Sequence, residues 1–328
     1  MLSRRRVPAR PSSPISWALG ALAALLVGAL GVHQQILHQG RHPLRTKAKQ
    51  DTVARLKSPA TVTLPATSVP ETLPFPIGEN SGILWNLSTG QLLWADHPHL
   101  REPYASTTKL MTIYLVMQHL PLTRVVTISP AAAGTSGSDI FMAVGDRFTV
   151  RQLLYALMLR SANDAAIALA QAEAGTVGRF VDQMNAMAKT LGMRQTTYRD
   201  PDGLSPQSAG TAWDLSIIAR LDMESPLFRQ IVRTKETSLP YNPVVTNLNG
   251  LLFLDPTVIG IKSGWTTAAG FNLVFAATRP VDGHPVTLMG VLMHGQLGFP
   301  PEYQDAERLL NWGFQRVKAS DSGLRAGP

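Results

Sequence analysis

The sequence contains no cysteine in its 328 residues. This absence excludes a disulfide framework, a zinc finger, a thiolate-bound iron–sulfur cluster and a cysteine nucleophile. Charged residues are also scarce, at 16% of the chain, whereas 45% of the residues are hydrophobic. This composition is typical of a globular protein with a well-filled core and argues against a disordered chain.

A basic surface on the folded body is also missing. The formal net charge is +8, and residues 1–75 hold ten basic residues against two acidic ones. The rest of the chain carries 20 basic and 20 acidic residues and is therefore neutral. Because nucleic-acid binding needs a basic face on the fold itself, we expect no nucleic-acid partner.

The N-terminal segment has the pattern of an export signal. Residues 1–14 carry four arginines, and residues 15–32 form an apolar run of 18 residues without a charge. This run exceeds the usual core of about 7–15 residues in a signal peptide and approaches the roughly 20 residues of a membrane-spanning helix. The pattern predicts a basic cytoplasmic segment followed by a transmembrane anchor or signal peptide, with the anchor favoured. The positive flank places the rest of the chain outside the cytoplasm.

Residues 33–75 show no hydrophobic period and include five prolines. They are predicted to form an extended linker between the N-terminal helix and the body.

Hydrophobic periodicity predicts one α/β domain over residues 76–318, followed by a tail at 319–328. A β-hairpin is expected over 82–95, with its turn at 88–90, and buried strands are expected near the other end of the domain. Strands at both ends with helices between them predict a sheet that joins segments distant in sequence. The remaining expected elements are helices at 106–118, 150–159, 164–174, 177–191 and 303–314, and strands at 258–261, 270–278 and 286–293.

The first candidate motif is Ser106-Thr-Thr-Lys109, at the start of a predicted helix. Residues three apart share a helix face, so the Lys109 amine can reach Ser106 Oγ. A serine becomes a nucleophile when a base removes its proton, and a partly buried lysine can be neutral enough to do this. The helix N-terminus also offers N–H groups to an oxyanion. Taken alone, the motif is more typical of an N-cap serine followed by a solvated lysine.

Two further motifs carry polar groups at the ends of predicted elements. Ser161-Ala-Asn163 lies on a short loop, where a hydroxyl and an amide can contact a lysine, a peptide carbonyl or a transferred proton. Lys262-Ser-Gly264 ends a β-type run and offers a cation and a hydroxyl to a carboxylate, while the glycine leaves room for a peptide backbone. Taken alone, they are typical of a capped loop and of an ordinary strand exit.

In this order the three motifs form the Ser-x-x-Lys, Ser-x-Asn and Lys-hydroxyl-Gly set. Over about residues 77–318 the chain resembles the serine D-alanyl-D-alanine carboxypeptidases, the low-molecular-mass penicillin-binding proteins of peptidase family S11. The supporting stretches are residues 105–112, 160–166, 247–252, 260–274 and 309–314. The resemblance implies a β-lactamase/transpeptidase-like α/β fold. Such a fold has a mainly antiparallel sheet flanked by helices and a helical subdomain, with the active site between them.

The resemblance also implies the catalytic residues. Ser106 would be the nucleophile and Lys109 its general base, while Ser161 and Asn163 would relay protons and hold the substrate backbone. The backbone N–H groups of Ser106 and Trp265 would form the oxyanion hole. The implied reaction is attack on the D-Ala–D-Ala bond of a peptidoglycan stem peptide, release of D-alanine and hydrolysis of a serine ester.

Substrate binding is implied for Lys262, Ser263, Gly264, Trp265 and Thr266, with the lysine and the Ser263 hydroxyl on the terminal carboxylate. β-Lactams, which mimic the dipeptide, would acylate the same serine. No metal or organic cofactor is expected. The implied location is the extracytoplasmic face of a bacterial cell membrane.

Three positions depart from the family pattern. Ser263 replaces the usual threonine, which keeps the hydroxyl and predicts altered rates with function retained. Trp265 adds either an aromatic wall to the cleft or plain packing. His294-Gly-Gln296 stands where some relatives carry an arginine that binds the substrate carboxylate, so Lys262 is expected to bear more of that task.

Other activities use the same motifs. A D,D-endopeptidase that cuts peptidoglycan cross-links is the main alternative, since sequence separates it poorly from a carboxypeptidase. A class A β-lactamase needs a glutamate followed four residues later by asparagine, and none of Glu173, Glu224 and Glu236 has that partner. A catalytically silent cell-wall-binding protein would lack the nucleophile or its base.

Overall fold

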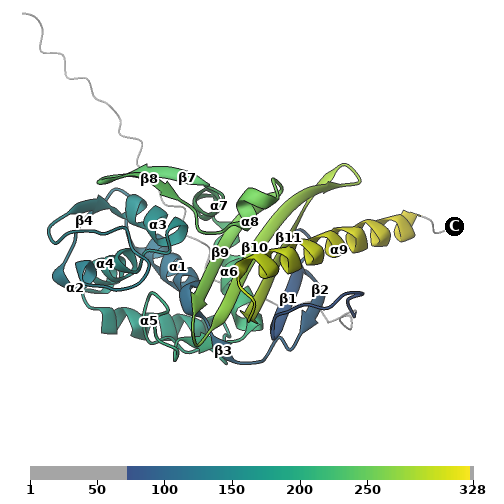
Figure 1. The fold of residues 1–328 in the computed structure, drawn as a ribbon, viewed down its shortest axis with the longest axis horizontal. Helices are drawn as coiled ribbons and strands as arrows, with labels where there is room; N and C mark the ends of the chain where they lie inside the picture. Colours follow the sequence, from purple (N-terminus) through teal and green to yellow (C-terminus); the bar gives the residue numbers. More distant parts are fainter. Residues whose placement is uncertain (1–71, 326–328) are drawn as a thin grey trace, which may run out of the picture. The chain divides into compact units, whose positions relative to one another are not determined.

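The body is built on a five-stranded antiparallel sheet, seen edge-on in the middle of Figure 1. The computed structural model describes residues 72–325. The strand order is β2-β1-β11-β10-β9, so the first and last strands of the domain pair with each other, as the sequence predicts. The strands are β1 (Ser81–Asn86), β2 (Gln91–Asp96), β9 (Val258–Thr266), β10 (Gly270–Val281) and β11 (His284–Gly295).

Both predicted hairpins are present, β1–β2 and β10–β11. The second turns at Asp282 and Gly283, whose φ angles of 48° and 83° suit a two-residue turn between twisted strands. Strand β9 is longer than predicted. It continues through Lys262–Thr266 because these residues pair with β10, although their composition alone indicates a turn.

Ten helical segments lie between and after the strands in the described part of the chain. Thr149 caps α3 with a capping box to Gln152, as predicted. The prediction that Ser106 caps a helix is wrong, because Ser106 lies inside a 3₁₀ turn, η1, which precedes α1. The segments are η1 (Ala105–Thr108), α1 (Lys109–His119), α2 (Pro130–Ala133), α3 (Val150–Leu159), α4 (Asn163–Ala174), α5 (Val177–Thr190), α6 (Ala212–Glu224), α7 (Pro226–Val232), α8 (Leu251–Leu254) and α9 (Phe299–Arg325).

Three short strand pairs lie outside the main sheet. They join segments that flank the helices, and one of them, β7–β8, is a local hairpin. The pairs are β3 (Glu102–Pro103) with β6 (Ala209–Gly210), β4 (Val125–Thr127) with β5 (Arg147–Thr149), and β7 (Glu236–Leu239) with β8 (Asn242–Thr246).

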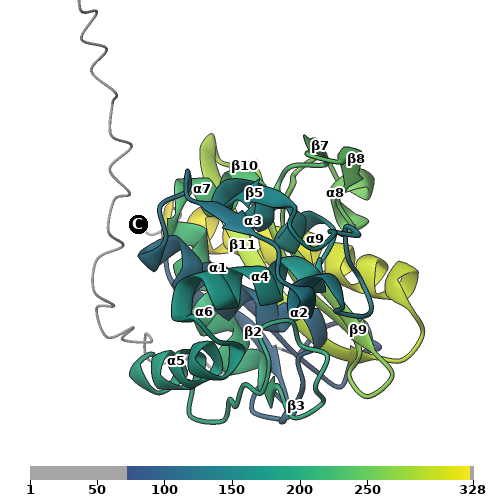
Figure 2. The ribbon, with the colours of Figure 1, turned by 90° about the vertical axis from the view of Figure 1, so that its left-hand side faces the viewer.

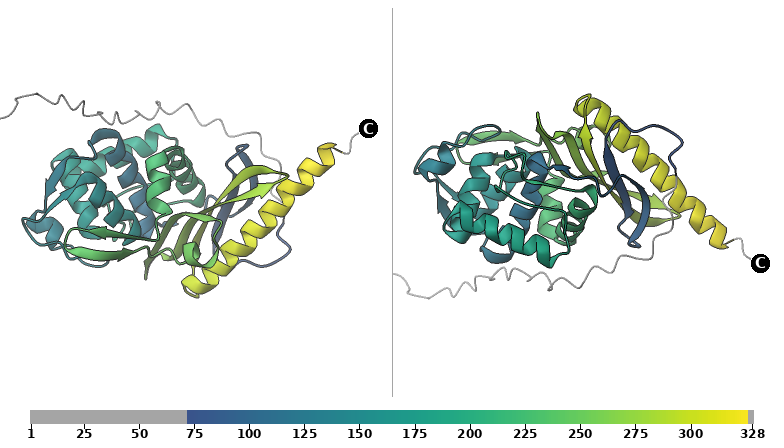
Figure 3. Two further views of the ribbon diagram at one scale, coloured as in Figure 1. Left: turned by 90° about the horizontal axis from the view of Figure 1, so that it is seen from above. Right: turned by 90° about the horizontal axis from the view of Figure 1, so that it is seen from below.

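Two hydrophobic cores lie on the two faces of the sheet. Alternate residues of one strand enter different cores: in β10, Val274 and Ala276 face the helical layer, whereas Leu273 and Phe275 face α9. Figure 3 shows α9 along one face and the large group of helices that contains α1 across the opposite face, while the short α8 belongs to the core on the α9 side. Each fully buried leucine or phenylalanine contributes about 1.5–3 kcal/mol, so the alternation fixes the sheet between two layers.

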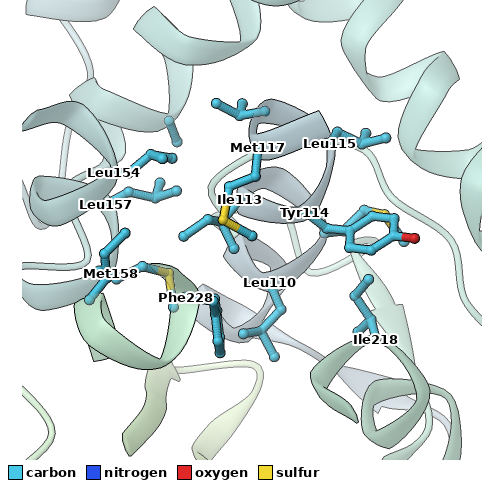
Figure 4. Close-up of a cluster of buried hydrophobic side chains, with 14 of the residues drawn as sticks. Leu110, Ile113, Tyr114, Leu115, Met117, Leu154, Leu157, Met158, Ile218 and Phe228 are labelled. Carbon is cyan, nitrogen blue, oxygen red and sulfur yellow. The ribbon is translucent and has the colours of Figure 1, made fainter. Parts of the chain in front are cut away.

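Helix α1 runs through the middle of the helical layer, which faces the viewer in Figure 2. Ile113 lies towards α3, Leu110 lies beside Phe228 of α7, and Tyr114 lies beside Ile218 of α6 (Figure 4). The first nine residues of α1 are all buried, including Lys109 at its start. The packing therefore holds the N-terminal end of α1 firmly beside β9.

Within residues 72–325 no helix has the length and apolar character needed to cross a membrane. The predicted N-terminal segments at 1–14 and 15–32 and nearly all of the linker lie outside the described residues.

Candidate active site

Ser106 sits in the turn η1, between the sheet and the helical layer. The preceding residue, Ala105, has a left-handed backbone with φ of 47°. Ser106 is partly exposed, whereas Ala105 and Thr107 on either side are buried. A Cβ added at Gly264 of β9 would lie 2.9 Å from Ser106 N, so the strand backbone passes directly over the serine amide.

Lys109 is fully buried one helical turn after Ser106. Its Nζ lies 3.0 Å from Ser106 Oγ, 2.8 Å from Asn163 Oδ1 and 2.6 Å from the carbonyl oxygen of Asp202. The last two partners can only accept hydrogen bonds. A neutral lysine amine donates its two hydrogens to them, which leaves its lone pair directed at the Ser106 hydroxyl.

The surroundings favour that neutral form. Burial lowers the pKa of Lys109 to about 8, and the negative charges of Asp202, Asp200 and Asp164 oppose this fall. A large fraction of Lys109 is therefore unprotonated in mildly alkaline solution. This arrangement can remove the proton of Ser106 as it attacks a carbonyl.

Ser161 and Asn163 lie at the junction of α3 and α4. Asn163 starts α4, and its Nδ2 donates to Ser136 O at 2.8 Å, which orients its Oδ1 towards Lys109. Ser161 has a left-handed backbone with φ of 58°. Its Oγ is buried and has no hydrogen-bond partner among the described residues. A buried hydroxyl without a partner is available to a substrate or a water molecule.

Lys262 and Ser263 lie within β9, the edge strand beside η1. Lys262 is buried, and its Nζ donates to Ser263 O at 2.7 Å. Burial, and after it the charge of Lys109, lowers the pKa of Lys262 well below its ordinary value. A carboxylate bound here would supply the opposite charge that this lysine needs. The outer edge of β9 has no neighbouring strand in the sheet, so its backbone groups can pair with an extended peptide.

The other predicted binding residues have different surroundings. Trp265 is 53% exposed, and its ring lies 5.9 Å from that of Phe271, so it is only partly packed. The Thr266 hydroxyl accepts a hydrogen bond from Ala269 N within the β9–β10 turn, which gives it a local structural contact. Gln296 is exposed and bonds to His294 O at 3.4 Å.

The structure thus joins Ser106, Lys109 and Asn163 by direct hydrogen bonds. It adds Asp202, whose backbone carbonyl accepts a hydrogen bond from Lys109 and which lies outside the three sequence motifs. The adjacent Gly203, with φ of 84°, lies against Ala105, where a Cβ would overlap the Ala105 carbonyl. A backbone carbonyl contact has no side-chain signature, so the turn motif Asp200-Pro-Asp-Gly203 is the only sequence signal for it.

None of the three glutamates considered for a β-lactamase lies in this arrangement. Glu173 is near the far end of α4 and pairs with His119 at 2.7 Å. Glu224 is exposed at the end of α6, and Glu236 in β7 accepts a hydrogen bond from Thr246. The described structure therefore places none of them beside Ser106 as a base for rapid deacylation.

Comparison with known proteins gives consistent matches. The sequence profile of the D-alanyl-D-alanine carboxypeptidase family matches residues 68–294. The D-alanyl-D-alanine carboxypeptidase DacD of Salmonella typhimurium is 35% identical over 273 residues, covering 76% of this chain and 67% of that protein. The D-alanyl-D-alanine endopeptidase of Escherichia coli is 31% identical, covering 72% and 77%.

The fold also matches a solved structure. The crystal structure of the Streptomyces K15 DD-transpeptidase superposes with a TM-score of 0.69 at 33% identity. The match covers 74% of this chain and 100% of that one.

Proposed function

This chain belongs to the D-alanyl-D-alanine carboxypeptidase family, and from this premise we propose that it removes the terminal D-alanine from peptidoglycan stem pentapeptides. The observation that carries the proposal is the position of Lys109. Its buried amine contacts Ser106 Oγ and has two fixed acceptors for its own hydrogens. This geometry supports a serine nucleophile with a lysine base.

In the acylation step, Ser106 Oγ bonds to the carbonyl carbon of the D-Ala–D-Ala bond, and its proton passes to Lys109. The negative charge that develops on the carbonyl oxygen is stabilised by the backbone N–H groups of Ser106 and Trp265. The C–N bond then breaks, a proton is delivered to the leaving amine, and D-alanine departs. Ser161 lies at the same junction as Asn163, and we assign its free hydroxyl to this proton transfer.

In the deacylation step, a water molecule attacks the serine ester, and Lys109 accepts its proton. Lys109 then returns this proton to Ser106 Oγ as the bond between the serine oxygen and the acyl carbon breaks. The products are the shortened peptide and free Ser106, so the proton balance closes. A β-lactam follows the same first step, in which its ring opens and no leaving group departs. Slow hydrolysis of that ester would make these drugs inhibitors.

Lys262 and Ser263 recognise the terminal carboxylate in this proposal. An incoming peptide lies along the free edge of β9, and its carboxylate restores the charge of the buried lysine. Gly264 permits the close approach of β9 to η1, since a Cβ there would lie 2.9 Å from Ser106 N. Trp265 and Thr266 extend the same wall.

A D,D-endopeptidase activity on cross-linked peptides is the second candidate. It is supported by the match to the E. coli endopeptidase over 72% of this chain. Both activities use the same acyl-enzyme and differ in the group that leaves.

We further propose that residues 15–32 anchor the protein to the membrane and that residues 33–75 hold the catalytic domain, residues 76–318, on the extracytoplasmic side. The support is the basic flank and the uncharged run in the sequence.

Incubation of the purified protein with a pentapeptide and, separately, with a cross-linked muropeptide tests the function. Release of D-alanine from the pentapeptide is expected, with slower or no cleavage of the cross-link. Faster cleavage of the cross-link would favour the endopeptidase. Neither product would contradict both.

A further inference from the structure

The turn that carries Ser106 contains a conformation that needs external support. Ala105 adopts a left-handed backbone, with φ of 47°, immediately before Ser106. This conformation is unfavourable for an alanine relative to a right-handed one. Such a residue persists only where neighbouring groups fix the backbone on both sides. The groups that fix it therefore also fix the direction of the Ser106 N–H.

Asn272 of β10 holds the chain just before Ala105. Its side chain is fully buried, and its Nδ2 donates to Pro103 O at 3.0 Å and to Tyr104 O at 3.1 Å. Its Oδ1 accepts a hydrogen bond from His294 N at 2.8 Å. The side-chain amide group of Asn272 thus donates to two consecutive backbone carbonyls, and its oxygen accepts a hydrogen bond from the end of β11.

The same asparagine lies beside the strand that forms the other wall of the site. In the β9–β10 ladder Asn272 is the partner of Gly264, where an added Cβ would lie 2.9 Å from Ser106 N. One side chain therefore connects η1 to the strand pair that faces it. Movement of Asn272 would change the spacing between Ser106 N and β9, which is the spacing of the proposed oxyanion hole.

We propose that Asn272 is a positioning residue for acylation. It holds the Pro103 and Tyr104 carbonyls so that Ala105 stays left-handed and the Ser106 N–H points at the developing oxyanion. The proposal rests on the function proposed above, in which Ser106 is the acylated nucleophile. Asn272 itself touches neither substrate nor the Ser106 hydroxyl.

Asn247 provides a matched control. It is also buried, and its Nδ2 donates to two backbone carbonyls, those of Val232 and Thr234, at 3.3 and 3.0 Å. Its Oδ1 accepts a hydrogen bond from Asn249 N. None of these partners belongs to η1 or to β9. Substitution of Asn247 reproduces the loss of three buried hydrogen bonds without changing the support of Ala105.

The first test compares Asn272→Leu and Asn272→Asp with Asn247→Leu in the full-length protein. The acylation rate constant with benzylpenicillin is measured by intact mass, and the melting temperature is measured alongside. We expect the Asn272 variants to acylate at least about tenfold more slowly, since loss of one oxyanion donor costs 10²–10³-fold in other enzymes. Asn247→Leu should acylate within about threefold of the wild type at a similar loss of melting temperature.

A second measurement separates positioning from general damage. A peptide boronic acid forms a bond between Ser106 Oγ and boron, the serine proton passes to Lys109, and the boron carries the negative charge. Its affinity depends on the oxyanion hole and should fall in Asn272→Leu by about the same factor as acylation. The affinity of a D-Ala-D-Ala peptide, measured in the Ser106→Ala background, should change by less than about twofold when Asn272→Leu is added.

The outcomes distinguish the two proposals. A wild-type protein that forms no Ser106 adduct contradicts the proposed function itself. The positioning role alone is overturned if the wild type acylates and the Asn272 variants acylate equally well. It is also overturned if these variants lose affinity for the boronate and for the peptide by the same factor. If Asn272→Leu does not fold, Asn272→Asp, which keeps the size and the acceptor oxygen, decides the question by the same measurements.

Discussion

Two regions of this molecule bury groups of like charge. Lys109 and Lys262 lie close together at the candidate active site, where burial lowers the pKa of each. Glu79, Glu302 and Asp305 meet where the segment before β1 packs against α9. There, burial raises the pKa of Glu79 to about 8 and that of Glu302 well above its ordinary value. Perturbed ionisation alone therefore does not distinguish an active site from a structural cluster.

The partners of these groups make the difference. Lys109 contacts the hydroxyl of a partly exposed serine, so it is placed to accept the proton of that serine when the serine attacks a substrate. Asp305 accepts hydrogen bonds from Gly78 N and Arg308, which fastens the chain before β1 to α9. Both Glu302 oxygens are buried without a partner among the described residues. The carboxyl cluster thus holds a segment in place, whereas Lys109 contacts the hydroxyl of Ser106, the proposed nucleophile.

The largest effect is expected from Lys109→Met, which keeps the volume of the side chain and removes the base. Acylation by benzylpenicillin should fall by about 10³-fold, within the 10²–10⁴ range of general-base catalysis. The melting temperature should stay level or rise, because burial of an amine is unfavourable. Lys189→Met, at an exposed position of α5, is the control. A Lys109→Met protein that acylates within tenfold of the wild type would place the base elsewhere.

The pH dependence of acylation tests whether Lys109 must lose its proton before Ser106 reacts. The rate should rise with pH as Lys109 loses its proton, with a midpoint near its pKa of about 8. The negative charge of Asp202 raises the pKa of Lys109, so Asp202→Asn should move the rising limb to lower pH. The side-chain amide oxygen that this substitution introduces can still accept from Leu204 N, as the Asp202 carboxylate does. Asp182→Asn, at an exposed site on α5, should leave the limb in place. A limb that stays or moves to higher pH in Asp202→Asn would disprove the coupling.

The carboxyl cluster should show its ionisation in stability and not in activity. The pKa values of Glu79 and Glu302 are raised in the folded protein, so their contribution is full below about pH 4.5 and declines as pH rises through the folded values. The melting temperature should therefore fall between pH 6 and 9. Glu302→Gln removes one ionising group and should reduce this fall, by about 2–4 °C for each kcal/mol that the ionisation of Glu302 costs in a domain of this size.

Acylation by benzylpenicillin should stay within about twofold of the wild type in the Glu302→Gln variant. An identical pH dependence of melting in the two proteins would show that the cluster does not ionise in this range. A large loss of acylation would show that the cluster acts on the cleft.

Much of the fold is predictable from the sequence because its elements are strongly periodic. The strands of the β10–β11 hairpin and the helices α3, α4 and α5 lie within a few residues of their predicted bounds. The turn η1 was not predictable in the same way. A helical pattern begins at Ser106, but contacts from Asn272, Gly203 and Gly264 tighten the first residues into a 3₁₀ turn. Those contacts come from segments far along the chain.

The residues of the candidate site also fall into two groups, those that the sequence indicates and those that only the folded chain reveals. Ser106, Lys109 and Asn163 carry their own side-chain signatures, and their order along the chain was enough to select them. The backbone carbonyl of Asp202 accepts a hydrogen bond from the Lys109 side chain, and the side-chain amide of Asn272 donates to backbone carbonyls of another segment. A contact that involves a backbone group on one side has no paired side-chain motif in the sequence. Their positions depend on the pairing of β9 with β10 and on the path of the loop after α5. They become visible only when the chain is folded.

The most direct test of the central claim is the intact mass of the protein after incubation with benzylpenicillin, for the wild type and for Ser106→Ala. We expect a persistent adduct of one drug mass on the wild type and none on the variant, with both proteins equally stable. An adduct of the same yield on Ser106→Ala, or an unmodified wild type beside intact drug, would contradict the claim that Ser106 is a nucleophile activated by Lys109.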